Sequence, residues 1–555
     1  MALAQPVWSR VDEAAHYDVI AQYAAGIYPR DAQTTIRPET LDVMRRAGVY
    51  GFVVDNTYVQ PDTGFQSMPE GLSDSEHVLW IRRHGYQYSY EAFQPPLYYA
   101  VALPAWLAGN ALGGPVGALY AVRIFDALLA ALLAPLSLFI ALRLWPANRI
   151  AALAAALVTG VLPGVALNLT SVTNDVLVAV LGGACVLVAV SGSWTWRRVI
   201  LLGLVFGAAL LTKTTAAGLA PALAVALLQR GRGGGLRPLL GVGAVAAALV
   251  APWIASNLAI YGELITTREQ LAMAAFPART ASLDFWSVST LHSFVTFWTG
   301  DPFLSVPGSV PLAFLAAFIA ALALAGMVRM ARRPGLEVSR PVLLIVAVAA
   351  AGAALVSVTS PVLAAFNAPG RLAYVGLCAA VALVAAGLWV ELPSPRLRWA
   401  TIGVFTGLSL AGLALSAIPP SPLPAGAGSP AIKARVAVQA GAAFGRFYVL
   451  VESCAVDTSG DQWVEVRFQN AGPEPVEWSQ TVEVRDRGMP VARSDYARST
   501  PFPMAFAPGR SYSGWLWLGP ETRLHGLAGS SLHLAGLATD GYRTIGDLDV
   551  PVSLC

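Results

Sequence analysis

Charged residues are scarce in this sequence of 555 amino acids. They make up 12% of the chain, whereas hydrophobic residues make up 56%. A soluble globular domain carries about 25% charged residues, so this composition excludes a soluble globule and predicts a membrane protein. The formal net charge of +3 is small and gives no support for nucleic-acid binding. The sequence also lacks a glycine-rich phosphate loop, so no nucleotide substrate is expected.

Apolar segments of membrane-spanning character fill the chain between residues 117 and 418. We count ten of them, which predicts a polytopic α-helical membrane protein. Two segments, 199–212 and 214–229, are shorter than the ~20 residues that cross a bilayer unaided, and should form a hairpin of short helices around Lys213. The ten segments are 117–142, 150–168, 175–193, 199–212, 214–229, 238–257, 308–328, 341–358, 372–390 and 399–418.

Arginine residues occupy every second gap between these segments. Because short loops rich in arginine stay in the cytoplasm, this alternation predicts one orientation in the plasma membrane. The N-terminal region, the loop 258–307 and the C-terminal region then lie outside the cytoplasm. The stretch 95–113 would break the alternation if it crossed the bilayer, so we expect a juxtamembrane helix there. The basic gaps contain Arg143, Arg149, Arg197, Arg198, Arg230, Arg232, Arg237, Arg329, Arg332, Arg333, Arg340, Arg396 and Arg398.

Residues 1–116 are expected to form an extracytoplasmic first loop with juxtamembrane helices. The segment from Val11 to Ile27 suits an amphipathic helix, and Ser9 with Asp12 forms a helix-start signal. No apolar segment precedes this region to carry it across the membrane. We therefore expect a lost helix upstream of Met1, which would raise the number of spans to about 11.

After residue 418 the composition changes abruptly. A Pro- and Gly-rich linker covers 419–430, and the short alternating segments beyond it predict an extracytoplasmic β-sandwich over 431–555. Cys454 and Cys555 bracket this domain in a compartment that permits disulfides, so we expect them to pair. Core packing and carbohydrate binding both remain open for its tryptophans, which are Trp463, Trp478, Trp515 and Trp517.

Asp12 and Glu13 are the leading candidates for catalysis. A carboxylate in the first outer loop suits a general base that takes a proton from an acceptor hydroxyl. The alternative is that acids in a first helical turn stabilise the helix dipole. His16 follows Asp12 by four residues and lies on the same helix face, where it would help to bind a substrate or a divalent metal ion.

Three further places at the outer membrane boundary carry polar chemistry. Asn174 and Asp175 would bind the acceptor or a metal, or else cap the helix that follows. Lys213 lies between apolar helices and would hold the phosphate of a lipid carrier, or extend toward the interface as a snorkelling lysine. Arg371 follows a Pro-Gly turn in a loop that is otherwise poor in arginine, which favours anion binding.

Two pairs of residues are expected to have structural roles. Arg123 and Asp126 lie three residues apart within one span, and should pair with each other or with neighbours because unpaired charges in a membrane are costly. Tyr98 and Tyr99 are expected to anchor the chain at the membrane interface.

Several of these positions follow a familiar order. The motifs are Asp12-Glu13, Gln94-Pro95-Pro96-Leu97-Tyr98-Tyr99, Arg123, Asn174-Asp175, Leu211-Thr212-Lys213, Pro252-Trp253, Asn257, Tyr261-Gly262 and Gly370-Arg371. Over about residues 8–400 the chain resembles the GT-C superfamily of membrane glycosyltransferases, in its protein mannosyltransferase-like and aminoarabinose-transferase-like branch. A bacterial family of predicted membrane proteins with a similar Asp-Glu-x-x-His start is a closer likeness.

The resemblance implies a transferase that uses a polyprenyl-phosphate sugar and an acidic base in the first outer loop. The base of these relatives corresponds to Asp12, with Glu13 beside it, and their second outer acid corresponds to Asp175. The acceptor would be an extracytoplasmic glycan, lipid or protein.

Two departures from these relatives concern the donor phosphate. Relatives often carry His or Lys where this sequence has Gln94, and often carry Arg where it has Ser256. Lys213 and Arg371 would then have to supply the cations. The alternatives to an enzyme are a flippase for lipid-linked saccharides, which would need polar groups at mid-membrane, and a scaffold that only displays the β-domain.

Overall fold

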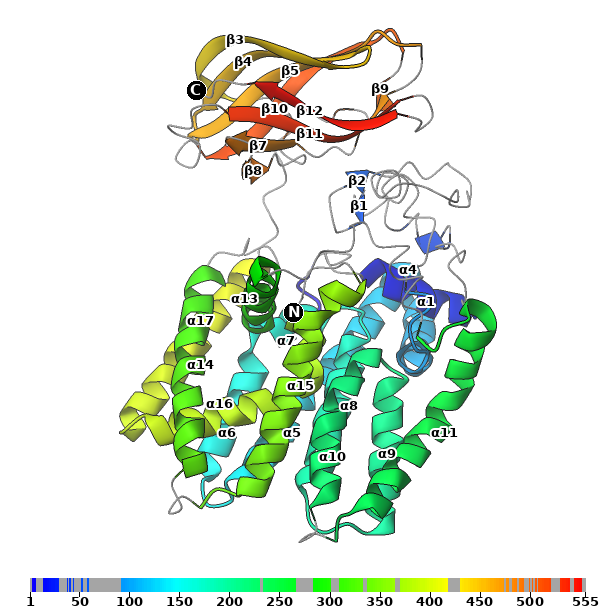
Figure 1. Cartoon of the computed structure of the whole chain (residues 1–555), viewed down its shortest axis with the longest axis vertical. Helices are drawn as coiled ribbons and strands as arrows, with labels where there is room; N and C mark the ends of the chain where they lie inside the picture. The colour runs from blue at the N-terminus through cyan, green and yellow to red at the C-terminus, as the bar shows by residue number, and fades with distance from the viewer. Residues whose placement is uncertain are drawn as a thin grey trace. The chain divides into compact units, whose positions relative to one another are not determined.

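The computed structural model contains two compact units, which we call the helical unit and the β unit (Figure 1). The helical unit contains Met1–Gly48 and Tyr88–Ile418, and the β unit contains Val49–Gln87 and Pro419–Cys555. The structure describes residues 2–5, 13–28, 37, 39–40, 43, 51–52, 57–58, 91–229, 233–265, 283–300, 309–332, 337–364, 370–417, 430–473, 476–478, 482–486, 489–493, 499, 502, 505–506, 508–520, 530–539 and 544–551.

The described residues of the helical unit form α-helices and two 3-10 helices. Their apolar side chains fill the spaces between neighbouring helices, and many others point outward, as expected for helices surrounded by lipid. The elements are α1 (Glu13–Ala24), α4 (Leu97–Ala131), α5 (Leu133–Leu144), α6 (Arg149–Val161), α7 (Pro163–Asn168), α8 (Asp175–Val190), α9 (Trp196–Leu210), η2 (Thr214–Leu219), α10 (Ala220–Leu228), α11 (Leu236–Tyr261), α13 (Leu283–Thr299), α14 (Ser309–Arg332), α15 (Arg340–Ala364), η4 (Gly370–Gly376), α16 (Leu377–Glu391) and α17 (Pro395–Ala417).

Six stretches of helix among the described residues are long and apolar enough to cross a membrane. Each contains or closely overlaps one of the predicted spans, so the chain is a helical membrane protein as predicted. The other predicted spans fall on the shorter helices α6 to α10, and their crossing of the bilayer stays a prediction. The six are Leu97–Leu144, Leu236–Tyr261, Ser309–Arg332, Arg340–Ser360, Gly370–Glu391 and Pro395–Ala414.

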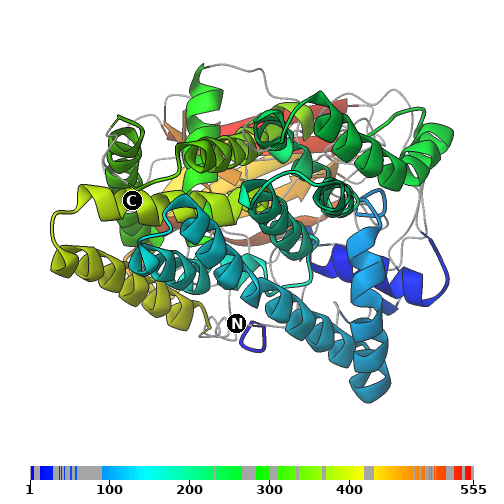
Figure 2. The same cartoon turned by 90° about the horizontal axis from the view of Figure 1, so that it is seen from below.

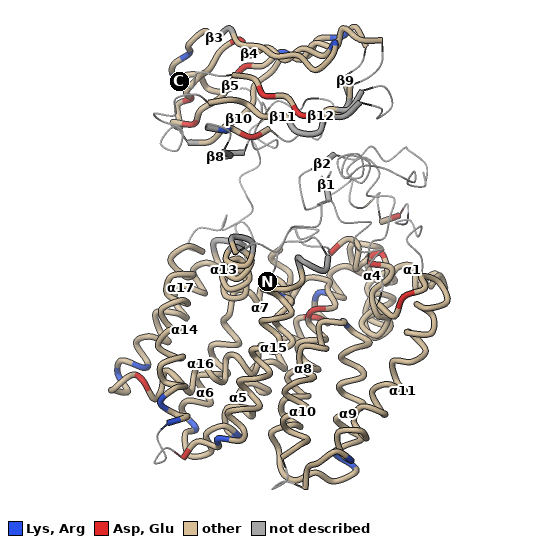
Figure 3. The backbone as a smooth tube through the Cα atoms, in the orientation of Figure 1, with Lys and Arg blue, Asp and Glu red and all other residues tan. Residues whose placement is uncertain are grey.

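The arginine-rich connections gather at one end of the helical unit (Figure 3). The backbone N–H of Ser339 donates to the carbonyl of Leu144 at 3.0 Å, which joins the start of α15 to the end of α5. Gln229 donates to the carbonyl of Pro341 at 3.4 Å, which brings the end of α10 to the same place. The predicted grouping of basic loops is therefore present, whereas the side of the membrane on which they lie stays a prediction.

The helix α4 consists of two halves joined by a sharp kink. Gly113 and Gly114 leave helical geometry there, and Gly114 has a φ of 62°, a conformation that favours glycine. The second half returns along the first. The two halves approach each other so closely at Gly109 that a Cβ there would collide with the backbone of Gly117. The helix expected at 95–113 thus ends at the expected place. It differs from the expected juxtamembrane helix because it packs against the second half of α4.

Helix α1 packs against α4 at one edge of the helical unit (Figure 2). The hydroxyl of Tyr17 donates to the carbonyl of Pro115, directly after the kink, at 3.1 Å. Every residue from Glu13 to Gln22 is buried. The helix predicted over Val11–Ile27 is present from Glu13 to Ala24, but its amphipathic character was wrong, because polar and apolar residues alike are buried as far as Gln22. Ser9 and Asp12 lie outside the described residues.

Two larger antiparallel sheets lie among the described residues of the β unit. One has the strand order β10-β5-β4-β3, and the other has the order β8-β7-β11-β6-β9, with β12 paired to β11. A separate two-stranded ribbon joins β1 to β2. The strands are β1 (Gly51–Phe52), β2 (Thr57–Tyr58), β3 (Ile432–Phe444), β4 (Phe447–Asp457), β5 (Asp461–Asn470), β6 (Val476–Glu477), β7 (Val482–Asp486), β8 (Met489–Arg493), β9 (Ala505–Phe506), β10 (Ser511–Pro520), β11 (Ser530–Thr539) and β12 (Thr544–Pro551).

The two larger sheets share one hydrophobic core, as expected for a sandwich. Phe468 and Leu516 come from one sheet and Val484 and Leu532 from the other, and all four side chains belong to the same buried cluster. Cys454 on β4 lies in this core and takes part in a disulfide. Cys555 lies outside the described residues, so its pairing with Cys454 stays a prediction.

Candidate active site

Two cations meet one carboxylate at the ends of three helical elements. Asp175 is the first residue of α8, Lys213 follows α9, and Arg371 is the second residue of η4. The ammonium of Lys213 lies 2.6 Å from Asp175 Oδ1, and Nε of Arg371 lies 3.7 Å from Asp175 Oδ2. Sequence reasoning had placed all three at one membrane boundary, and the structure brings them into contact.

The exposure of these side chains shows which charge can be reached. The side chain of Asp175 is 1% exposed, whereas those of Lys213 and Arg371 are 11% and 16% exposed. A ligand that approaches this cluster therefore meets the cations before the carboxylate. In this cluster of three described residues, two cations contact one acid, so it suits an anion better than a further cation.

The start of η4 is clamped in place beside α13. The backbone N–H of Gly370 donates to Thr296 Oγ1 at 2.7 Å. A Cβ at this position would collide with backbone atoms of Phe297 and Ser293, so only glycine fits. This close approach fixes the backbone directly before Arg371 and so positions its guanidinium.

Asn174 lies in the same region and is fully buried. Its side chain makes no capping hydrogen bond to α8, and neither of its amide atoms has a hydrogen-bond partner among the residues that the structure describes. The hydroxyl of Thr173 instead accepts from the backbone N–H of Asp175 at 3.2 Å. A buried amide without partners is costly, so we expect a bound group to supply them, and the role of Asn174 in acceptor binding stays a proposal.

Glu13 forms a buried ion pair with Arg123. The guanidinium donates to both carboxylate oxygens, at 2.7 and 2.6 Å, and neither side chain is exposed. The backbone N–H of Val172 donates to the same carboxylate at 2.9 Å. Glu13 therefore links α1 to α4 and to the segment before α8, an arrangement that suits a positioning residue better than a proton acceptor.

Asp126 is held by Tyr98 and not by Arg123. The hydroxyl of Tyr98 donates to Asp126 Oδ2 at 2.7 Å and accepts from the backbone N–H of Thr173 at 3.0 Å. Arg123 and Asp126 thus have separate partners, so of the two alternatives the structure shows pairing with neighbouring residues and not with each other. Their partners are residues far away in the chain, which the three-residue spacing within one span does not reveal.

His16 lies in an aromatic cluster next to this network. Its Nδ1 lies 2.9 Å from the hydroxyl of Tyr99 and 3.9 Å from a carboxylate oxygen of Glu91. Tyr98 and Tyr99 are completely buried, so the prediction that they anchor the chain at the membrane interface was wrong. Sequence reasoning did not single out Glu91, because a lone acid in a loop carries no distinctive signal.

Asp18, on the same helix as Glu13 and His16, anchors the segment after α1. Its Oδ1 accepts from the backbone N–H of Arg37 at 3.0 Å and from the hydroxyl of Thr40 at 2.8 Å, and Oδ2 accepts from Gln22 at 2.5 Å. Burial raises the pKa of Asp18 to about 6, although these hydrogen bonds and the charge of Arg37 act in the opposite direction.

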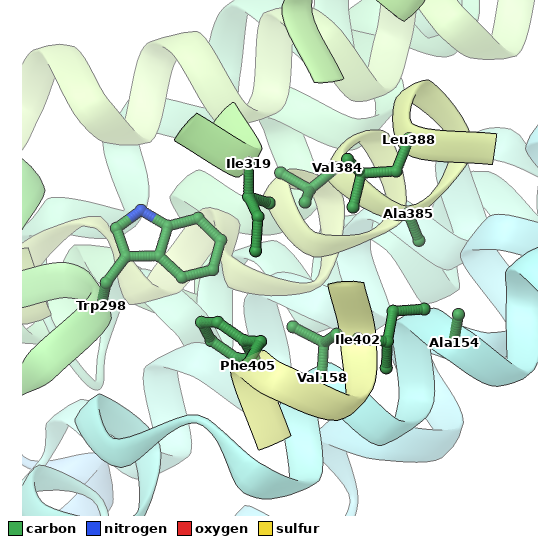
Figure 4. Close-up of a pocket in the computed structure, with 9 residues that line it drawn as sticks. All are labelled: Ala154, Val158, Trp298, Ile319, Val384, Ala385, Leu388, Ile402 and Phe405. Carbon is green, nitrogen blue, oxygen red and sulfur yellow. The ribbon is translucent and has the colours of Figure 1, made fainter. Parts of the chain in front are cut away.

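The described residues contain no group of three His, Cys, Asp or Glu side chains that could hold a metal ion. They do contain an apolar crevice between α6, α13, α14, α16 and α17 (Figure 4). Apolar side chains line this small gap between the helices, so it offers no contact to a charged head group. Its lining residues are Ala154, Val158, Trp298, Ile319, Val384, Ala385, Leu388, Ile402 and Phe405.

A family model described as Predicted membrane protein (DUF2142) matches residues 1–371 of this chain. The chain belongs to this family. The DUF2142 match includes Glu13, Asp175, Lys213 and Arg371, whereas the β unit from residue 419 lies beyond it. The likeness to a family of predicted membrane proteins that was inferred from the sequence is thereby confirmed.

This DUF2142 member is also similar to two solved structures of ArnT from Cupriavidus metallidurans. The structure bound to undecaprenyl phosphate matches with a TM-score of 0.41 and 17% identity, and covers 73% of this chain and 58% of that chain. The apo structure matches with a TM-score of 0.40 and 19% identity, and covers 60% and 57%. The match thus spans less than two thirds of the ArnT chain. No curated protein matches the sequence.

Proposed function

We propose that this protein is a GT-C-type glycosyltransferase of the plasma membrane, which transfers a sugar from a polyprenyl-phosphate donor to an extracytoplasmic acceptor. The observation that carries the proposal is the meeting of Lys213 and Arg371 at the buried carboxylate of Asp175. Cations at this site would hold the donor phosphate and stabilise the negative charge that it gains as the sugar departs.

The position of the cluster favours a lipid-linked donor. All three charged residues lie at or directly beside the ends of helical elements, and α8 after Asp175 and α9 after its first turn are apolar. A lipid phosphate reaches such a boundary from the bilayer while its hydrocarbon remains among apolar side chains. A flippase would instead need polar groups along the membrane depth.

The acceptor hydroxyl has to lose a proton as it attacks the anomeric carbon. We assign this proton to Asp12, which directly precedes α1, and assign to Glu13 the task of fixing the start of that helix through Arg123. His16, Asn174 and Asp175 would line the acceptor side. A scaffold without catalysis has no need for Asp175, Lys213 and Arg371 to converge, so their contact favours an enzyme.

Binding of undecaprenyl phosphate to the purified protein in detergent tests the donor site. Lys213→Ala and Arg371→Ala should each weaken binding at least about tenfold in native mass spectrometry, because each removes a charge-assisted contact to phosphate. Arg398→Ala is the matched control, since Arg398 donates to the carbonyl of Leu392 among the arginine-rich connections. Equal binding by all three variants and the parent protein would contradict the proposed donor site.

A further inference from the structure

One face of the four-stranded sheet in the β unit presents half-buried tryptophans. Along β10, Leu516 and Leu518 point into the core. Because side chains alternate along a strand, Trp515 and Trp517 lie on the opposite, outer face. Both indoles remain partly exposed in the protein. Trp478, by contrast, belongs to the core. The sequence left core packing and carbohydrate binding open for these tryptophans, and the structure assigns core packing to Trp478.

The indole of Trp517 is held in a fixed orientation. Its ring N–H donates to Asp461 Oδ2 at 2.9 Å. Trp463 lies directly opposite on β5, is buried, and donates its ring N–H to Asp457 Oδ2 at 2.9 Å. Two carboxylates thus satisfy the polar ends of two neighbouring indoles and fix the direction of their rings.

A fixed array of polar groups lies beside Trp515. The guanidinium of Arg435 lies 5.4 Å from the centre of the Trp515 ring, donates to Ser453 Oγ at 3.0 Å, and forms an ion pair with Glu465. The hydroxyl of Ser453 also donates to Glu465 at 2.7 Å. Glu465 is the direct cross-strand neighbour of Trp515, so planar donors and acceptors border the indole.

Arg435 and Arg467 are each paired with a glutamate on this face, and Asp457 and Asp461 add negative charge beside the indoles. Arg435 pairs with Glu465, and Arg467 pairs with Glu452 at 2.5 Å. An anionic partner, such as a nucleic acid or an anionic membrane, would require an excess of positive charge. The face therefore suits an uncharged partner, with an apolar side for the indoles and hydroxyl groups for the carboxylates and the guanidinium.

We propose that this outer face, centred on Trp515 and Trp517, is a binding site for an uncharged saccharide. A pyranose ring presents C–H groups on its flat faces, which pack on indole, and equatorial hydroxyls that accept and donate in the ring plane. Alternate residues of one strand are about 7 Å apart, a separation comparable to one sugar ring, so the two indoles suit adjacent sugars of one chain. The site is independent of the transferase proposal, since it shares no residue with the Asp175 cluster.

Isothermal titration of the full chain in nanodiscs with cellohexaose, mannohexaose and maltohexaose tests this site. We expect binding of at least one hexasaccharide, with little dependence on salt because the ligand is uncharged. Trp515→Ala and Trp517→Ala should each weaken that binding at least roughly tenfold, through loss of aromatic packing. Tyr448→Ala is the matched control. Tyr448 is an aromatic side chain that is 40% exposed on β4 of the same sheet, where it pairs across the strands with Gln469 and not with either tryptophan.

Unchanged melting temperatures of both tryptophan variants would show that the β unit still folds. Absence of binding to all three hexasaccharides would overturn the proposal, and so would equal affinity of the tryptophan variants and the parent protein. Binding only to vesicles of anionic phospholipid, or only to a protein partner captured by cross-linking to this face, would also overturn it.

Discussion

The buried ion pair between Glu13 and Arg123 allows a sharp test of how α1 is held. Glu13→Gln removes the carboxylate that accepts two hydrogen bonds from Arg123, whose side chain is 0% exposed. Removing one partner of a buried pair costs about 3–5 kcal/mol, because the remaining charge stays out of water and loses the carboxylate that compensated it. The variant should therefore lose much of the stability of the helical unit.

A second ion pair in the helical unit provides the matched control. Arg329 pairs with Glu391 at 3.2 Å, but the side chain of Arg329 is 49% exposed. Water screens such a pair, so Glu391→Gln should cost no more than about 1 kcal/mol. The two variants remove the same charge from the same residue type, and differ mainly in burial. Reversible unfolding in mixed detergent micelles would measure both free energies of unfolding.

The double variant Glu13→Gln with Arg123→Gln separates lost charge from lost packing. It removes both charges, so it should be more stable than Glu13→Gln alone, with a coupling free energy of about 0.5–3 kcal/mol. If Glu13→Gln is as mild as Glu391→Gln, Glu13 serves only as an acid in a first helical turn, which is worth about 0.3–1 kcal/mol. That result would refute the role of the pair in positioning α1.

Three other predictions concern catalysis, oxidation state and pH. Asp12→Asn should lower sugar transfer by about 10²–10⁴-fold while binding of undecaprenyl phosphate persists, and near-normal turnover would remove Asp12 from the mechanism. Cys454 and Cys555 should resist maleimide labelling until the protein is reduced, and labelling of both without reductant would exclude the bridge. Burial raises the pKa of Asp18 from 3.8 to about 6. Between these two values the folded protein binds a proton at Asp18 that the unfolded chain has released. The free energy of unfolding should therefore fall as pH rises from 4 through 6. Asp18→Asn should lack this slope in melting temperatures measured between pH 4 and pH 7.5, and identical slopes in both proteins would contradict the assignment.

The sequence predicted those parts of the fold that depend on local pattern. Apolar length identified the membrane helices, and the short segments on both sides of Lys213 did form α9 and η2 with α10. Alternation along the chain likewise predicted strands after residue 431. The signals lie within single segments in each case, which is why they can be read without the tertiary structure.

Partners that are distant in the chain could not be predicted in the same way. Glu13 and Arg123 are separated by 110 residues, and nothing in either local pattern indicates the other. Tyr98 and Tyr99 look like interfacial residues because they follow two prolines at the edge of an apolar segment. Their burial depends on the kink at Gly114, which folds the second half of α4 over the first. The convergence on Asp175 was expected only as a shared boundary, without its distances.

The order of the charged residues along the chain has a consequence for biosynthesis. A membrane protein is made from its N-terminus, so Asp175 and Lys213, which are 38 residues apart, can pair long before Arg371 leaves the ribosome. An incomplete chain holds a neutral pair of one acid and one base at this place. Only the arrival of η4, set against α13 by Gly370, adds the second positive charge. The proposed affinity for phosphate would therefore appear as one of the last steps of assembly.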